Sequence, residues 1–324
     1  MNWALVGTGG ITNRFLIGLS EAAGAKPYAI VSRTQENADY FAAKYGIEKA
    51  YGDYEAMLND DAVDAVYIGT PHVTHKDLGI KAFKAKKAVL CEKPVCINAA
   101  ELTEMIAEAR ANKVFFMEAM WTRFVPPLVK AREWLREGLI GEVKMVQANF
   151  CFSAPMNKES RLYNIELGGG ALLDAGVYPI SLASMVFGGN MPEKITSLMY
   201  LGETGVDEEV SALLSYGGPH MAQVNAAISA ACINDAWIYG AQGHIHLPNF
   251  VFSHSAALSG RYTYNYEPDF VSNGYNYEVE ELMHCVNEGR LESDVMSLDE
   301  SLNIMRTMDE IRSQWDFRYP GEEV

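Results

Sequence analysis

Residues 3–12 read WALVGTGGIT, and this stretch decides the fold of the first part of the chain. Its four leading apolar residues predict a short buried strand, which Gly7 ends with a tight turn. Gly9 and Gly10 stand where a helical pattern begins. A glycine turn between a strand and a helix lets the backbone approach a pyrophosphate at the positive end of the helix. The stretch therefore predicts a dinucleotide site that includes Gly7, Gly9, Gly10 and Ile11.

The alternation of strand and helix signals continues beyond this motif, although Thr12 stands where GxGxxG has its third glycine. Strands separated by helices of ordinary length indicate βαβ units and a parallel sheet. The further strand signals lie at 28–31, 64–68, 88–91 and 114–117, and the helical signals between them at 36–45, 75–85 and 98–112.

The pattern changes after about residue 120. Helical signals at 127–137 and 170–186 accompany strand-like runs joined by short turns, at 143–152, 194–201, 208–216, 221–230, 236–240 and 250–257. Strands that follow one another through short turns predict an antiparallel sheet. An amphipathic helix with a capping box at Ser297 and Glu300 closes the chain. We therefore expect an α/β domain over 1–120 and an α+β domain with an open, mostly antiparallel sheet over 121–324.

The composition excludes several classes of partner. The 324 residues include 42 acidic and 26 basic ones, a formal charge of −16, so neither nucleic acid nor an anionic membrane surface is an expected partner. No run of about 20 residues looks apolar enough to span a bilayer, and the first ten residues lack the pattern of an export signal. The five cysteines are scattered and include no CxxC pair. They predict reduced thiols and a cytoplasmic protein.

The end of the second strand decides between the two dinucleotides. An NAD site usually has an acidic residue there, which binds the ribose 2′-hydroxyl. This chain has Ser32, Arg33 and Thr34 instead. Arg33 could hold a 2′-phosphate, with Ser32 and Thr34 as hydroxyl donors, although a solvated surface arginine would look the same. We expect NADP and keep NAD as the alternative.

Two further loops follow predicted strands at the edge of the sheet where ligands bind. The first contains Thr70, Pro71 and His75, and the second contains Glu92 and Lys93, followed by Pro94. Alone, the Glu-Lys-Pro sequence would be a loop with solvated charges. Together with the glycine motif it predicts cofactor contacts from both loops.

The Glu-Lys-Pro sequence and the change of pattern near residue 120 resemble the glucose–fructose oxidoreductase and inositol dehydrogenase superfamily. Three segments, 117–124, 168–178 and 308–312, are most similar to its dimeric dihydrodiol dehydrogenases. The resemblance implies a Rossmann domain, NADP, and oxidation of a secondary alcohol on a sugar such as D-xylose or on a cyclic diol. It also implies a homodimer through the C-terminal sheet. Inositol is a poorer fit, because inositol dehydrogenases have histidine where this chain has Tyr178.

The same resemblance implies an active site lined by Lys93, Asp174 and Tyr178, with Trp121 and Arg123 beside the cofactor or substrate. Asp174 and Tyr178 are four residues apart in a helical pattern and so share one face. A tyrosine is a poor base at neutral pH, but a nearby ammonium such as Lys93 would lower its pKa. We expect Tyr178 to take the hydroxyl proton and Asp174 to orient Lys93. From spacing alone, a structural carboxylate and a packed ring would be the stronger interpretation.

Other functions remain open. His244 and His246 share a strand face and His254 follows, but no carboxylate or cysteine is adjacent in the sequence, so we expect no metal. The chain could oxidise another polyol or a sugar acid with NAD. It could also be a non-catalytic sensor of dinucleotides, although the presence of Lys93 and Tyr178 favours an enzyme.

Overall fold

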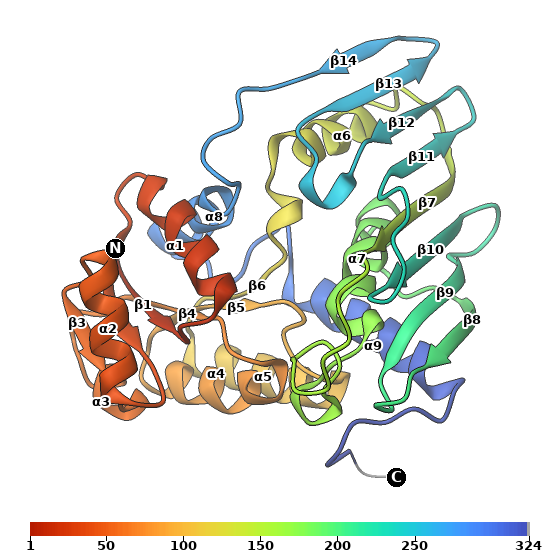
Figure 1. Cartoon of the computed structure of the whole chain (residues 1–324). Coiled ribbons are helices and arrows are strands. Elements are labelled where there is room, and N and C mark those ends of the chain that lie inside the picture. Colours follow the sequence, from red (N-terminus) through yellow and green to blue (C-terminus); the bar gives the residue numbers. More distant parts are fainter. Residues whose placement is uncertain (323–324) are drawn as a thin grey trace. The chain divides into compact units, whose positions relative to one another are not determined.

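The computed structural model describes residues 1–322 of the chain (Figure 1). Its residues pack into two compact units, each with a sheet of its own. The first unit contains Met1–Cys96, Ala100–Phe124 and Phe270–Leu298. The second contains Ile97–Ala99, Val125–Asp269 and the chain from Asp299 onward.

The first unit is built on a parallel six-stranded sheet in the order β3-β2-β1-β4-β5-β6. The order reverses between β1 and β4, which is the doubly wound arrangement of a Rossmann domain. Figure 1 shows α1 and α8 on one face of this sheet and α4 and α5 on the other. The strands are β1 (Asn2–Val6), β2 (Lys26–Val31), β3 (Lys49–Tyr51), β4 (Ala65–Ile68), β5 (Ala88–Glu92) and β6 (Phe116–Ala119). The helices are α1 (Gly10–Glu21), α2 (Gln35–Tyr45), α3 (Tyr54–Leu58), α4 (His75–Lys84), α5 (Ala99–Asn112) and α8 (Asn276–Asn287).

Helix α8 returns to the first unit from far along the chain and packs on α1. Gly18 makes the close approach possible, because a Cβ there would lie 2.6 Å from Cβ of Tyr275 and 2.7 Å from the backbone nitrogen of Asn276. The packing units therefore differ from the single division at residue 120 that the sequence predicts. Residues 270–298 belong with the first unit because α8 packs beside α1.

The second unit is built on an eight-stranded sheet in the order β14-β13-β12-β11-β7-β10-β9-β8. Its pairs are antiparallel except for β7 with β10, so the predicted fold class is confirmed. The strands are β7 (Val143–Cys151), β8 (Lys194–Leu201), β9 (Asp207–Ser215), β10 (Met221–Ala227), β11 (Ala236–Gly240), β12 (Gly243–Leu247), β13 (Ala256–Gly260) and β14 (Tyr264–Tyr266). Helices α6 (Pro126–Arg136), α7 (Val177–Val186) and α9 (Leu298–Ser313) line one face of the sheet (Figure 1).

Two sequence predictions for this unit are wrong in detail. A strand was expected over 250–257, but Phe250–Phe252 forms a 3-10 turn and β13 begins only at Ala256. Asn249, with a φ of +46°, turns the chain there and directs Phe250 into the core.

The helical segment Ile165–Val186 is also long and apolar enough to span a membrane by length and composition, contrary to expectation. Its apolar window is 89% buried inside the structure, as in the core helix of a globular domain.

Candidate active site

The glycine turn of the first unit has the geometry of a phosphate-binding loop. Gly7 has a φ of +100°, and a Cβ there would lie 3.0 Å from the carbonyl oxygen of Gly69, so only glycine fits. A Cβ on Gly9 or Gly10 would meet no described atom within 4 Å. None of the described side chains caps α1 at Gly9, and its first turn carries no acidic residue. The N-terminal N–H groups of α1 are therefore available to an anion.

Thr12 takes over the packing role of the third glycine. Its side chain is fully buried, and a Cβ on Gly69 would lie 2.9 Å from Oγ1 of Thr12 and 2.7 Å from the ring of Tyr67. The glycine that allows α1 to approach the sheet thus stands on the strand side, after β4. The departure from GxGxxG leaves the close packing of helix and strand intact.

Ser32 and Arg33 follow the end of β2. The backbone nitrogen of Ser32 donates to the carbonyl oxygen of Tyr51 (3.0 Å), and Oγ1 of Thr34 accepts from the backbone nitrogen of Asn37 (3.3 Å) and so caps α2. Arg33 between them is exposed and forms no ion pair with any described residue. A cation fixed at its backbone and solvated at its head group suits a phosphate ligand.

His75 links the two loops that follow β4 and β5. It is fully buried, with Nε2 2.8 Å from the carbonyl oxygen of Thr70 and Nδ1 3.2 Å from that of Pro94. Burial lowers the pKa of His75 to about 4, so the ring is neutral at pH 7. This geometry gives His75 a structural role that fixes Thr70, Pro71 and the Glu-Lys-Pro loop. A direct cofactor contact by His75 stays a prediction.

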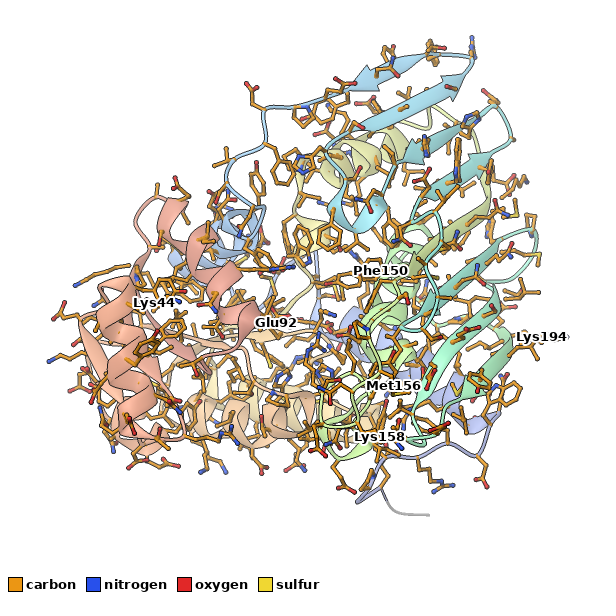
Figure 2. The ribbon with its side chains drawn as sticks, in the orientation of Figure 1. Lys44, Glu92, Phe150, Met156, Lys158 and Lys194 are labelled. Carbon is orange, nitrogen blue, oxygen red and sulfur yellow. The ribbon has the colours of Figure 1, made fainter. Side chains whose placement is uncertain are left out.

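Glu92, which is labelled in Figure 2, anchors the Glu-Lys-Pro loop through its carboxylate. The carboxylate is buried and accepts from the hydroxyl of Tyr67 (2.6 Å) and from the backbone nitrogen of Lys93 (3.2 Å). Phe15 stacks on Tyr67 at 3.6 Å, which holds that hydroxyl in place. Because its neighbour is fixed in this way, Lys93 is held at the carboxyl end of β5, and its side chain is half-buried.

Trp121 and Arg123 form a 3-10 turn directly after β6. Both are buried within the first unit. The Trp121 ring stacks on Tyr275 at 5.0 Å, and the Arg123 guanidinium donates to the carbonyl oxygen of Val295 (3.4 Å). The segment before α8 therefore supports this turn. Sequence reasoning missed that support because no pattern connects residues so far apart.

Asp174 and Tyr178 belong to the second unit. The sequence predicts a continuous helix there, but Leu172–Gly176 forms a π-helical turn that precedes α7. Such turns are frequent at functional sites. Asp174 lies in this turn and Tyr178 is the second residue of α7, so both side chains depend on where the turn begins.

Both side chains are buried and have partners within the second unit. Nη1 of Arg161 donates to Oδ1 of Asp174 (2.6 Å), and the ring of Tyr178 meets Phe150 edge to face at 5.3 Å. Arg161 was not predicted, because it comes from an irregular loop without periodicity or motif. Its guanidinium gives Asp174 a cationic partner within the second unit. The orienting role that the sequence gives Asp174 toward Lys93 stays a prediction.

The histidines of the second unit are explained by pairing and stacking. His246 lies 2.7 Å from Oδ2 of Asp235 and stacks on Trp237 at 3.8 Å. Asp235, which directly precedes β11, is not adjacent to these histidines in the sequence and reaches His246 through the pairing of β11 with β12. Within residues 1–322 no group of three or more metal-ligating side chains occurs. A single carboxylate beside His246 leaves the metal hypothesis without a ligand shell.

Comparison with protein families matches both parts of the chain. The model described as an oxidoreductase family with an NAD-binding Rossmann fold matches residues 1–120. The model of the Gfo/Idh/MocA C-terminal domain matches residues 128–246.

Curated relatives are similar over nearly the whole chain. A trans-1,2-dihydrobenzene-1,2-diol dehydrogenase from Xenopus laevis is 39% identical, and the match covers 98% of this chain and 99% of that protein. The protein of the same name from Homo sapiens is 34% identical, with 100% and 99% covered.

Solved structures share the fold over the same length. An aldose-aldose oxidoreductase from Caulobacter crescentus matches with a TM-score of 0.88 at 23% identity, over 98% of each chain. A 3-ketoreductase from Actinomadura kijaniata in complex with NADP and TDP-benzene matches with a TM-score of 0.85 at 25% identity, over 97% of each chain.

Proposed function

Because the chain belongs to the Gfo/Idh/MocA oxidoreductase family, we propose that it is an NADP-dependent dehydrogenase of sugars or cyclic trans-diols. The reaction is the oxidation of a secondary alcohol, or its reverse. The observation that carries the proposal is the open, uncapped N-terminus of α1 above Gly9 and Gly10, at the point where the strand order reverses. The names of the curated relatives support a diol as substrate.

The residues of the first unit would hold the cofactor. The N–H groups of α1 would bind the pyrophosphate and Arg33 the 2′-phosphate, with Ser32 beside it. No acidic residue follows β2 to favour the 2′-hydroxyl of NAD. When bound, NADP supplies the hydride acceptor at its nicotinamide ring. The chain's own part is to bind, orient and move the proton.

The proton is assigned to Tyr178. Its phenolate oxygen would take the hydroxyl proton of the substrate, and the contact with Phe150 fixes the ring for that transfer. Lys93 would supply the positive charge that stabilises the phenolate. Asp174, which forms an ion pair with Arg161, would orient Lys93. Tyr178 and Lys93 are thus proposed as catalytic residues and Asp174 as their partner.

A substrate screen tests the proposal. Aldoses, polyols and cyclic trans-diols are supplied with NADP and then with NAD, and the absorbance of the reduced cofactor is followed. We expect turnover of D-xylose or a trans-dihydrodiol, with NADP preferred. Tight NADP binding without turnover of any substrate would contradict the enzyme and favour the sensor.

The assembly proposed for this enzyme is a homodimer through the open face of the second sheet. Large side chains are exposed on that face, at Leu198, Tyr200, Leu213 and Met221. The small side chains of β10, such as Ala226, do not contribute to that face, because they pack against α7 and the π-helical turn Leu172–Gly176, here called the π-turn. An exposed apolar sheet face favours an interface. Light scattering at micromolar concentration should give twice the chain mass, and a monomer would contradict the dimer.

The cellular location stays a prediction. All five cysteines are free thiols in the structure, which supports the cytoplasm as the compartment.

A further inference from the structure

A buried carboxylate from another strand lies at the start of the π-turn. Asp207 is the first residue of β9 and is fully buried. Its Oδ2 accepts a hydrogen bond of 2.5 Å from the backbone nitrogen of Leu172, where the π-turn begins. The backbone N–H of Ala171 also favours the charged form of Asp207. The carboxylate thus pairs with one of the N–H groups that a helix leaves unpaired at its N-terminus.

The glycines before the π-turn make this contact possible. Gly170 has a φ of +126°, and a Cβ there would collide with Oδ1 of Asp207 and lie 3.3 Å from the hydroxyl of Tyr319. A Cβ on Gly169 would lie 2.7–2.9 Å from three carbonyl oxygens of the 161–164 loop. The hydroxyl of Tyr319 donates to the carbonyl oxygen of Gly169 (2.8 Å). The backbone at Gly169 and Gly170 is therefore packed so closely that only glycine fits at both positions. At Gly170 the close neighbour is Asp207.

The segment that follows carries the two side chains assigned to the reaction. Asp174 lies two residues after the anchored Leu172, and the backbone nitrogen of Asp174 donates to the carbonyl oxygen of Gly170 (3.3 Å). Tyr178 follows at the start of α7. A shift of the first π-turn residue would move both side chains together. We propose that Asp207 is a positioning residue for the dehydrogenase reaction, which anchors the π-turn at Leu172 and so fixes Asp174 and Tyr178.

This inference rests on the proposed function, and the charges around Asp207 give it a measurable signature. Burial raises the pKa of Asp207 to about 7, although the N–H groups of Leu172 and Ala171 and the charge of Arg312 favour the carboxylate. Tyr319 faces Asp207 as well, and burial together with the Asp207 charge raises the pKa of that phenol well above its ordinary value. Glu322 and Asp174 complete the charged surroundings of Tyr319. Because the carboxylate is the stronger acceptor, the anchor should strengthen as the pH rises through about 7.

Three variants test the anchor. Asp207→Asn keeps an acceptor for the N–H of Leu172 but cannot ionise, Asp207→Ala removes the acceptor, and Glu209→Gln removes an exposed carboxylate two residues along the same strand. For each we would measure kcat and KM from pH 5.5 to 9, NADP affinity by tryptophan fluorescence, and hydrogen exchange of the Leu172 amide without substrate.

We expect Asp207→Ala to lose about 10- to 100-fold in kcat, the cost of a small misplacement of reacting groups, with little change in NADP affinity. Its Leu172 amide should exchange faster than in the wild type. Asp207→Asn should keep most of the wild-type amide protection and kcat. The wild-type kcat should rise with pH near 7, where Asp207 ionises, and Asp207→Asn should lack this rise. Glu209→Gln should behave as the wild type.

If the Leu172 amide exchanges at the wild-type rate in Asp207→Ala, Asp207 does not anchor the π-turn. The proposal is also overturned if kcat of Asp207→Asn still rises with pH near 7. If Asp207→Ala does not fold, Asp207→Asn still decides through its pH profile and its amide exchange. A wild-type protein that turns over no substrate would refute the proposed function instead, and the exchange measurement would still decide whether Asp207 holds the turn.

Discussion

Replacing Arg33 by alanine should separate the affinities for NADP and NAD. Arg33 is exposed and forms no ion pair with the described residues, so its removal should not disturb the fold. The cap of α2 comes from Thr34 and remains in place. A hydrogen bond to a charged group contributes about 1.5–3 kcal/mol. The dissociation constant for NADP should therefore rise about 10- to 150-fold, while that for NAD barely changes.

Titration of both cofactors by tryptophan fluorescence measures the two constants in parallel. Arg136→Ala is the matched control, because Arg136 is an exposed arginine at the end of α6 in the other unit. Its affinities should equal those of the wild type. Raising the salt concentration should reduce the difference between the dissociation constants for NADP and NAD in the wild type. Salt screens the contact between Arg33 and the 2′-phosphate, because Arg33 is exposed. If Arg33→Ala loses the same factor for both cofactors, Arg33 does not bind the 2′-phosphate.

Three further predictions concern the proton, the buried ion pairs and the thiols. Tyr178→Phe should lower kcat by about 10²–10⁴-fold at nearly constant NADP affinity, and adding Lys93→Met should cost little more, since groups that act together are not additive. Steady-state kinetics checks this, and activity within about threefold of the wild type would assign the proton to another group. Arg312→Leu should lower the free energy of unfolding by about 3–5 kcal/mol in urea titrations, because it leaves two carboxylates on α9 and the following segment without their cation. Arg312 lowers the pKa of the Glu322 carboxyl, so the wild type should lose part of this stability as the pH falls through the acid range, whereas Arg312→Leu should not. The exposed control Arg306→Leu should change stability by less than about 0.5 kcal/mol, and an equal effect of both variants would contradict the role of the buried pairs. Cys232 is the exposed thiol and should react first with a thiol reagent in the native protein, which mass spectrometry of labelled peptides would show; faster labelling of a buried cysteine would contradict the packing.

The first sheet could be predicted from the sequence because its strands are short apolar runs between helices. Residues 65–68 are buried throughout, and so are those of β5. The three-residue strand β3 was missed, since Lys49 and its neighbours are too few to show a period. Helix α8 was missed for another reason. Asn276 and Glu278 are polar but fully buried, so polar residues stand on the face of α8 where an amphipathic helix would have apolar ones.

The candidate site was predictable where a short motif carries it. Gly7, Gly9 and Lys93 stand in local patterns whose chemistry depends on sequence neighbours. Arg161 and Asp207 do not, because each meets its partner through the tertiary fold. The π-turn was also beyond prediction, since an α-helix and a π-turn have the same composition and only the anchoring contacts select between them.

The return of α8 to the first unit has a consequence for the order in which a ribosome can complete the protein. Phe15 of α1 meets Tyr275 of the segment before α8 at 6.4 Å, and this partner is synthesised long after residue 124. At synthesis rates of about 5–20 residues per second, the intervening stretch takes roughly 7–30 s. During that time α1 lacks its native partner α8, while nearly all of the second sheet is synthesised. A chain stalled before residue 270 therefore lacks α8 beside α1, whereas α4 and α5, on the opposite face of the sheet, are already synthesised.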